Sequence, residues 1–311
     1  MDLRLIDCLM RVVEAGSINR AAEDLGLTQP ALSRRIAALE HDLGAALLVR
    51  KPRGVELTPA GELLITHAKP LLRQADILRD ALGQRVKTHV SIGLPFSLHD
   101  MVSVPFTVTE LRDASPMSLR VYEGFIHHLH QWMTQNIVDV GVMDYRGIEK
   151  SPHHVRPVIR EQLLLVGCGL DALALGEEVL PEQLEQMKLI LPGRPNVIRQ
   201  SIDDHLGRQG RRLHDVIDVE TLPLCLSFAS EGLGHTVMPY SAFHKQSMAG
   251  GQLQAIPVRN LYVAWALYVH ENRRHVAAVN KIANRLHEFM VNLVEQDRWS
   301  RAQVIGPRRG G

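Results

Sequence analysis

Side chains between residues 28 and 43 are suited to recognising base edges in double-stranded DNA. Gln29 and Arg34 are of the two residue types that pair bidentately with adenine and guanine, and the major groove admits an α-helix. We expect both to contact bases, with Pro30 at the same helix edge. The hydroxyl groups expected to contact phosphates belong to Ser17, Thr28 and Ser33. A glutamine and an arginine also occur on ordinary solvated helix faces, so this interpretation depends on the surrounding elements.

A cluster of basic residues follows this segment and provides a second candidate contact with DNA. It consists of Arg50, Lys51 and Arg53. Basic side chains beside a recognition helix neutralise phosphates, and an arginine can enter a narrow minor groove. Residues 1–58 carry as many acidic as basic residues, and the whole chain has a formal net charge of only +1. Any nucleic-acid surface must therefore be local.

The sequence offers no comparable set of residues for metal binding or catalysis. Two groups of histidines, at 127–130 and 153–154, lack the spacing of metal ligands. The three cysteines, Cys8, Cys168 and Cys225, lie far apart in apolar runs and are expected to be buried reduced thiols. We find no nucleophile elbow, phosphate-binding loop or GxGxxG motif. We therefore expect no metal, no cofactor and no enzymatic activity.

Three short helices are predicted to hold the candidate DNA-contacting residues in place. Apolar residues recur with helical spacing over 3–15, 18–25 and 28–43, and a glycine follows or separates these segments at each turn. This is the helix-turn-helix arrangement. Residues 47–49 and 55–57 are predicted to form a β-hairpin, which would be a wing beside the third helix.

A longer helix is predicted to begin at Pro59, with Thr58 as its N-cap. Its apolar residues are spaced alternately four and three apart, at Leu64, Ala68, Leu71, Ala75, Leu78 and Leu82. This is a heptad pattern suited to pairing with another helix. We expect dimerisation through Leu64, Leu71, Leu78 and Leu82; packing of this face onto its own domain is the alternative.

From about residue 88 the pattern changes to short apolar strands that alternate with helices, which predicts βαβ units and mostly parallel sheets. The expected strands are 90–94, 119–122, 138–142, 163–166, 189–191, 216–219, 235–238 and 262–269. The expected helices are 98–113, 125–135, 196–208, 221–231 and 275–296. Residues 297–311 are expected to form a flexible tail.

The N-terminal residues MDLRLIDCLMRVVEAG contain charged side chains throughout, which is typical neither of a signal peptide nor of a membrane span. We expect a cytoplasmic protein without a membrane partner. Two alternatives are a plain solute-binding protein, in which only the α/β part matters, and an enzyme. The charged N-terminus and the three helices disfavour the first, and the missing catalytic motifs disfavour the second.

The first fifth of the chain resembles the winged helix-turn-helix of the LysR-type transcriptional regulators. The resemblance rests on GSINRAAEDL at 16–25, TQPALSRRI at 28–36, the pairs Leu39-Glu40 and Leu43-Gly44, and LTPAG at 57–61. A looser resemblance extends to about residue 296, and LPGRPNVIRQ at 191–200 looks most like the nitrogen-assimilation-control branch.

The resemblance implies an α/β protein with three parts. These are a winged helix-turn-helix domain over 1–58, a long linker and dimerisation helix over 59–88, and an effector-binding domain over 89–296. The last part would resemble a periplasmic solute-binding protein, with one subdomain at 89–161 plus 268–296 and a second at 162–267. A two-fold dimer formed through the heptad helix would read two half-sites of an inverted-repeat operator. The family resemblance further implies a homotetramer, and RNA polymerase is a candidate partner.

The resemblance also places a small-molecule effector between the two subdomains. Open α/β sheets bind ligands at the carboxyl ends of strands, and helix N-termini favour anions, so we expect an anionic effector. Ser97 is expected to cap a helix that starts there, and Arg194 to meet the anion. Ile126 stands where many family members have a Ser or Thr, which removes a donor and points to a more apolar pocket. The expected effector contacts are Ser97, Leu98, His99, Ile126, Gly193, Arg194 and Asn196.

Overall fold

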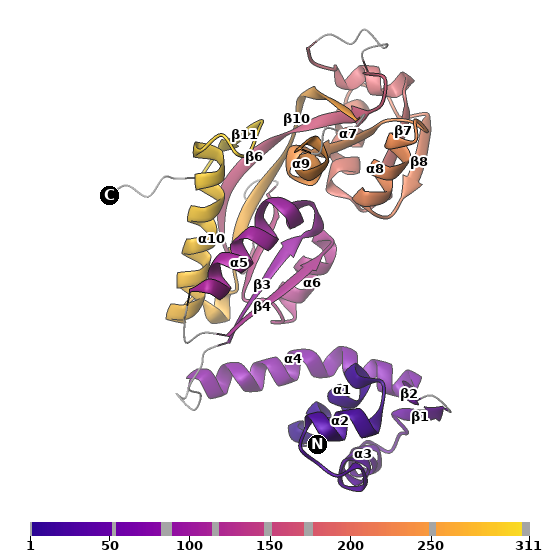
Figure 1. Ribbon diagram of the computed structural model, residues 1–311, viewed down its shortest axis with the longest axis vertical. Helices are drawn as coiled ribbons and strands as arrows, with labels where there is room; N and C mark the ends of the chain where they lie inside the picture. Colours follow the sequence, from indigo (N-terminus) through magenta and orange to yellow (C-terminus); the bar gives the residue numbers. More distant parts are fainter. Residues whose placement is uncertain are drawn as a thin grey trace. The chain divides into compact units, whose positions relative to one another are not determined.

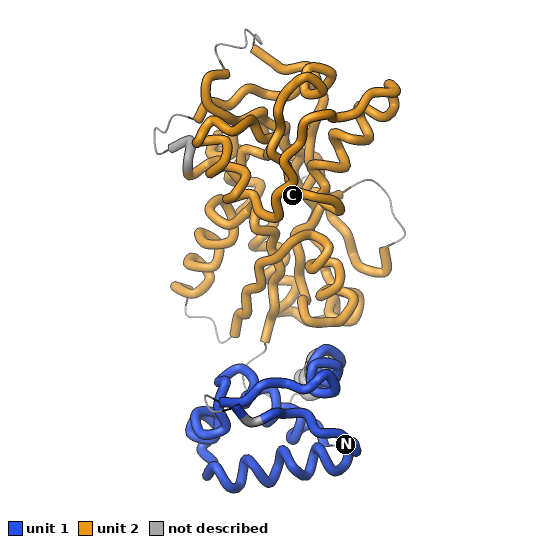
Figure 2. The backbone as a smooth tube through the Cα atoms, turned by 90° about the vertical axis from the view of Figure 1, so that its right-hand side faces the viewer, with its two compact units in different colours: residues 1–86 blue, residues 87–311 orange. Residues whose placement is uncertain are grey.

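The computed structural model describes residues 2–51, 54–81, 89–113, 118–145, 151–170, 177–248 and 253–306. The chain forms two compact units, residues 1–86 and residues 87–311 (Figure 2). Among the described residues, none of the helices is both long and apolar enough to cross a membrane.

The first unit contains the three predicted helices, the hairpin and the long helix. The helices are α1 (Leu3–Ala15), α2 (Ile18–Asp24) and α3 (Gln29–Leu43), and the hairpin is β1 (Leu48–Lys51) with β2 (Gly54–Leu57). The long helix is α4 (Pro59–Ala81). One apolar stripe from each helix forms the core, through Ile6, Leu9, Val12, Leu32, Ile36, Leu39 and Leu47. The predicted helix-turn-helix with a wing is confirmed (Figure 1).

The second unit is built on a seven-stranded sheet with the strand order β11-β6-β10-β5-β3-β4, and β9 pairs with β6 (Figure 1). Its strands are β3 (His89–Pro95), β4 (Ser118–Gly124), β5 (Val140–Asp144), β6 (His154–Gly167), β9 (Thr236–Pro239), β10 (Gln254–Val269) and β11 (Ala302–Val304). A separate sheet pairs β7 (Lys188–Pro192) with β8 (Asp215–Val219). The eight predicted strands are therefore present, with shifted ends.

Helices pack on both faces of the large sheet because the buried side chains of its strands alternate. Val142 and Leu267 face the core formed with α5 (Val104–Arg112) and α10 (Ala277–Glu295). Their neighbours Met143 and Tyr268 face α6 (Ile126–Thr134) on the other side. The remaining helices are α7 (Val197–Gly207), α8 (Leu222–Ser230) and α9 (Tyr240–Met248), with short turns η1 (Phe96–Leu98), η2 (His99–Ser103), η4 (Pro181–Gln186) and η5 (Glu271–Arg273).

Two long strands run through both predicted subdomains. The expected boundary at 161/162 lies inside β6, and the one at 267/268 lies inside β10. These strands pair with each other in antiparallel orientation, and β10 also pairs antiparallel with β5. Only β3 with β4, β3 with β5, and β7 with β8 are parallel among the named strands. The expectation of mostly parallel sheets was therefore wrong. Among the named strands, the two long strands pair only in antiparallel orientation, with each other and with β5, β9 and β11.

Three further expectations need correction. The helix expected over 98–113 consists of a 3₁₀ turn, a π-helical turn and α5, so Ser97 does not cap a helix start. The flexible tail expected over 297–311 is wrong for residues 297–306, because Trp299 is buried and β11 pairs with β6; residues 307–311 lie outside the described part. Cys168 is half-buried rather than buried, whereas Cys8 and Cys225 are buried.

Candidate functional site

The third helix presents the predicted DNA-contacting edge away from its core. Leu32 and Leu39 are fully buried, whereas Pro30 and Arg34 are exposed and Gln29 is half-buried. The Gln29 amide donates to the Ser33 hydroxyl at 3.0 Å, and Arg34 Nε donates to the Pro30 carbonyl at 3.3 Å. These short-range bonds hold both side chains along the helix surface.

Two of the expected phosphate contacts, Ser17 and Thr28, occupy N-cap positions without making capping hydrogen bonds. Ser17 precedes α2 and Thr28 precedes α3, both with extended backbone, and neither hydroxyl accepts a bond from the helix it begins. Their hydroxyl groups therefore have no role in closing these helix ends. Thr58 differs, because its Oγ1 accepts from Gly61 N at 3.0 Å and so caps α4 as predicted.

The wing is fixed to the third helix by a carboxylate that sequence reasoning missed. Glu40 Oε1 accepts from Leu47 N at 2.7 Å and from Leu48 N at 3.2 Å, so it binds the start of β1. On the other side of the hairpin, Val55 N donates to the Gly16 carbonyl at 3.3 Å. The only signal was the acidic residue near the end of α3, whose partners are backbone groups beyond a turn.

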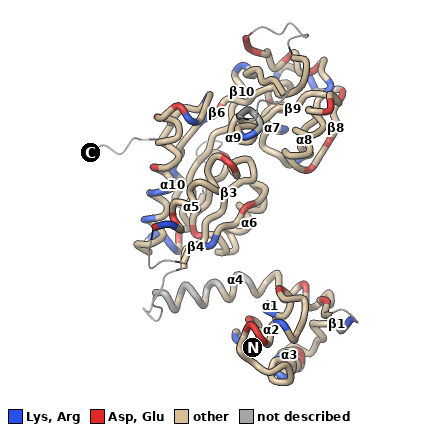
Figure 3. Tube along the Cα trace, viewed as in Figure 1, with Lys and Arg blue, Asp and Glu red and all other residues tan. Residues whose placement is uncertain are grey.

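The basic residues of the wing are only partly described. Lys51 is exposed and pairs with Glu56 across the hairpin at 3.3 Å. Arg50 lies in β1, but its side chain is outside the described residues, as is the whole of Arg53. Acidic and basic residues both occur along the described part of this unit (Figure 3).

The predicted heptad face of α4 divides into two parts. Leu64 and Ala68 pack against the core of the first unit, as the alternative interpretation required. Leu71 and Leu78 are 46% and 60% exposed among the described residues, so these two positions of the face are open to solvent there. Leu82 lies outside the described residues.

The second unit contains a cavity of about 360 Å³ at the carboxyl ends of β3 and β4. Four of the expected effector contacts line it: Ser97, His99, Ile126 and Asn196. Leu98 is fully buried in the core, and neither Gly193 nor Arg194 belongs to the lining.

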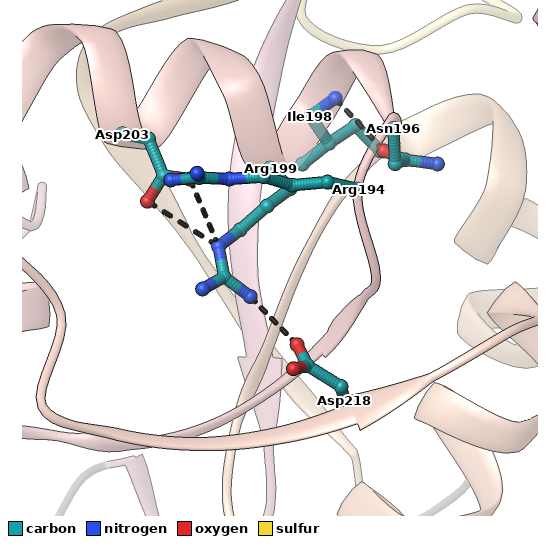
Figure 4. Close-up of polar contacts among 6 residues, drawn as sticks. All are labelled: Arg194, Asn196, Ile198, Arg199, Asp203 and Asp218. Carbon is teal, nitrogen blue, oxygen red and sulfur yellow. Dashed lines mark hydrogen bonds and ion pairs between the residues drawn. The ribbon is translucent and has the colours of Figure 1, made fainter.

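The expected anion-binding role of Arg194 does not fit its surroundings. Its Nε and Nη2 donate to Asp203 Oδ2 at 3.0 and 2.6 Å, and this bond raises the pKa of the guanidinium (Figure 4). The same carboxylate accepts from Arg199 Nε, and Arg199 Nη1 reaches Asp218 at 2.8 Å. Arg194 therefore belongs to a surface ion-pair network, and no lysine or arginine is among the described residues that line the cavity.

Six lining residues of the cavity are polar, and two of them, Asp100 and Glu220, are carboxylates: the set is Ser97, His99, Asp100, Asn196, Glu220 and Thr221. His99 Nδ1 lies 2.9 Å from Glu123 Oε2, and Asp100 pairs with Lys245 of α9 at 3.3 Å. Asn196 Oδ1 caps α7 by accepting from Ile198 N at 2.9 Å. Three helices, α6, α7 and α8, begin at the lining. Their N-termini supply partial positive charge.

The remaining lining is mainly apolar and includes aromatic residues that sequence reasoning missed. Phe96 and Phe125 meet edge to face with ring centroids 5.3 Å apart, and Trp265 closes the wall from β10. Ile126 adds to this apolar surface, as expected. The aromatic residue after each strand end was visible in the sequence, but nothing there indicated that β10 would contribute to the same wall.

The described residues contain no group of three or more His, Cys, Asp or Glu side chains arranged to hold a metal ion.

Comparison with known proteins agrees with these features. Residues 3–62 match the bacterial regulatory helix-turn-helix protein, lysR family, and residues 83–291 match the LysR substrate binding domain. The nitrogen assimilation regulatory protein nac of Klebsiella aerogenes is 27% identical over 307 residues, which cover 95% of this chain and 96% of that protein. The protein of the same name from Escherichia coli (strain K12) is 28% identical over 249 residues, covering 78% and 79%.

Solved structures share the fold along nearly the whole chain. CbnR, a LysR family transcriptional regulator, has a TM-score of 0.66 at 19% identity and covers 93% of this chain and 99% of its own. Full-length OxyR from Pseudomonas aeruginosa, in a cysteine variant, has a TM-score of 0.65 at 21% identity and covers 92% and 94%. The chain belongs to the LysR family and is a DNA-binding transcriptional regulator with an effector-binding domain, not an enzyme.

Proposed function

We propose that this regulator reads an inverted-repeat operator with Gln29 and Arg34 of α3, while the wing and the hydroxyl groups hold the phosphates. The outward-facing edge of α3 is the observation that carries the proposal, because a base-reading edge must be accessible to a groove. The proposed phosphate contacts are Ser17, Thr28, Ser33, Arg50, Lys51 and Arg53, with Pro30 beside the bases.

Replacing Arg34 tests the base-reading role. One bidentate pair contributes about 1–3 kcal/mol of discrimination, so Arg34→Ala should lower affinity for sites selected from a random duplex library by about tenfold or more. Binding to unselected DNA should change much less. Arg4→Ala is the matched control, because Arg4 is exposed at the start of α1 and pairs with Asp2. Equal affinity of the Arg34→Ala variant and the wild type for selected sites would refute the assignment.

We further propose that the cavity binds a small effector with an apolar body and an acidic group. The aromatic walls support the apolar body, and the N-termini of α6, α7 and α8 support the acidic group in place of Arg194. Each terminus contributes about 0.3–1 kcal/mol toward an anion. The proposed contacts are Ser97, His99, Ile126 and Asn196.

A thermal-shift screen of metabolites on the full chain tests this site. Ala242 lines the cavity from α9, so Ala242→Trp should fill part of the space and abolish the shift caused by a true effector. A set of hits that stabilise both proteins equally would place binding elsewhere and contradict the proposal.

We propose that α4 mediates self-association, first as a dimer and then as a homotetramer. The exposure of Leu71 and Leu78 supports this, because large apolar side chains in heptad positions favour a helical partner. Replacing both with lysine should yield monomers in analytical ultracentrifugation. An unchanged sedimentation coefficient would remove α4 from the interface.

The proposed division of labour follows the expected domains: 1–58 for DNA, 59–88 for association, and 89–296 for the effector, as subdomains 89–161 plus 268–296 and 162–267. A regulator of chromosomal operators works in the cytoplasm, and RNA polymerase is the partner through which it would act.

A further inference from the structure

A carboxyl group with no described cationic partner is buried behind the cavity. Glu161 of β6 is fully buried, and no lysine or arginine among the described residues forms an ion pair with it. It accepts three hydrogen bonds: from Ser241 N at 2.6 Å, from Ser241 Oγ at 3.0 Å and from Trp265 Nε1 at 3.1 Å. Burial raises the pKa of this carboxyl group, and the hydrogen bonds oppose that rise.

The donors belong to elements that form the cavity. Trp265 lies in the cavity wall, and Ser241 is in the first turn of α9, next to the lining residue Ala242. The other end of α9 reaches the cavity rim, where Lys245 pairs with Asp100. Glu161 thus holds both an aromatic wall residue and the helix that bridges the rim.

The C-terminal segment, residues 297–306, pairs with the backbone of β6 at Glu161 and its neighbour Gln162. Ala302 lies opposite Glu161 in the pairing of β11 with β6, and Gln162 N donates to the Arg301 carbonyl at 3.0 Å. Trp299 of the same segment is 2% exposed, and its indole nitrogen has no hydrogen-bond partner among the described residues. None of the described residues of this segment lines the cavity.

We infer that Glu161 is a positioning residue of the effector site, through which the cavity wall at Trp265 and helix α9 are coupled to the C-terminal segment. The inference rests on the proposed function of the cavity. Breaking any one hydrogen bond to a buried acceptor leaves an unpaired polar group in the interior, which costs free energy. The groups bonded to Glu161 are therefore expected to move together. Movement of the Trp265 indole or of α9 therefore shifts β6 at Glu161 and weakens its pairing with the C-terminal segment, whose strand β11 lies at the edge of the sheet.

Hydrogen exchange on the full chain tests the coupling without an effector. Trp265→Phe keeps an aromatic ring and removes the indole donor. Exchange should rise by about threefold or more both in 240–248 and in 297–306, since local opening follows lost interactions. Trp132→Phe is the matched control, because Trp132 packs on Tyr122 and His128 instead. Faster exchange confined to the strands beside Trp265 would overturn the inference.

A second comparison separates coupling from a general loss of stability. In a Glu161→Leu background, Trp265→Phe should cause no further rise in exchange at 297–306, because leucine has no acceptor for the Trp265 indole. Additive effects of the two substitutions would show that Glu161 does not connect them and would overturn the inference.

The aromatic anion anilinonaphthalene sulfonate separates this inference from the proposed function. Binding that is unaffected by Ala242→Trp would count against the cavity as an effector site, while the exchange results still decide the coupling. If binding is cavity-specific, it should slow exchange at 297–306 in the wild type and not in the Glu161→Leu variant. Protection limited to cavity-lining segments in the wild type would refute the coupling and leave the effector site standing.

Discussion

The position of the wing should depend on a single side chain, Glu40, and this dependence can be measured. Its Oε1 receives the amides of Leu47 and Leu48 at 2.7 and 3.2 Å, and Leu47 is only 1% exposed. Replacing Glu40 with alanine leaves both amides without their acceptor, and the one on Leu47 lies in the core. The substitution should therefore free the start of β1 from α3.

The expected cost follows from the two bonds. A hydrogen bond to a charged group contributes about 1.5–3 kcal/mol, and the two bonds share one oxygen, so their joint loss should cost about 3 kcal/mol. A carboxylate near a helix C-terminus is disfavoured by about 0.3–1 kcal/mol, which Glu40→Ala relieves. The net loss is about 2–3 kcal/mol. Glu40→Gln keeps an acceptor oxygen and should lose only about 1 kcal/mol.

Hydrogen exchange of the Leu47 and Leu48 amides in the full chain measures this loss directly. Because about 1.4 kcal/mol corresponds to a tenfold change, exchange should accelerate about a hundredfold in Glu40→Ala and about fivefold in Glu40→Gln. Glu14→Ala is the control, since Glu14 is 52% exposed and forms only a surface pair with Arg11. Exchange of the Glu40→Ala variant within about threefold of the wild type would refute the reasoning.

Three further predictions concern other parts of the chain. Gly54 has φ +128°, and a Cβ there would lie 2.3 Å from the carbonyl oxygen of the α1 C-cap; Gly54→Ala should cost about 1–3 kcal/mol and weaken DNA binding in gel shifts, whereas Gly193→Ala should change neither. Burial lowers the pKa of His270 from 6.5, so its neutral form stabilises the fold above pH 6.5 and this contribution is lost as pH falls through the lowered value; Tm should drop on acidification, and less steeply in His270→Asn, while equal slopes would contradict the assignment. Burial raises the pKa of Cys225 to about 11, so iodoacetamide at pH 8 should label the half-buried Cys168 first, as mass spectrometry of the native protein would show; equal labelling would show that the Cys225 thiol is accessible.

The helix-turn-helix could be predicted from sequence because its information is local. Three amphipathic stripes and their glycine turns place α1, α2 and α3 within a few residues, and Thr58 with Pro59 marks the start of α4. Capping hydrogen bonds were harder to predict, because the rotamer of a serine or threonine at a cap position depends on contacts with neighbouring side chains that the sequence does not show. Ser17 and Thr28 occupy the cap positions without bonding to the helix amides.

Elements held by distant partners escaped prediction. Helix α9 has no clear apolar period, and its contacts with the buried Glu161 and with Asp100 come from residues far away in the sequence. Strand β11 has only three residues, Ala302–Val304, and becomes a strand through pairing with β6. The ion pair of Arg194 could not be predicted for the same reason, because its partner Asp203 lies two turns along α7 and could not be distinguished in the sequence from other acids nearby.

The continuity of β6 and β10 limits how the effector-binding domain can deform. Both strands run uncut between the two halves, and their pairing shifts register between Pro257 and Tyr262 and again between Trp265 and Ala266. Such irregularities bend a strand and increase its local twist. The residues there are not paired between β6 and β10, so bending at these points breaks few hydrogen bonds between the two strands. The two subdomains should therefore move relative to each other by twisting of the paired strands β6 and β10, rather than by rotation about separate hinge segments. A single inserted or deleted residue at either irregularity would reset the resting angle of the halves while leaving each of them intact.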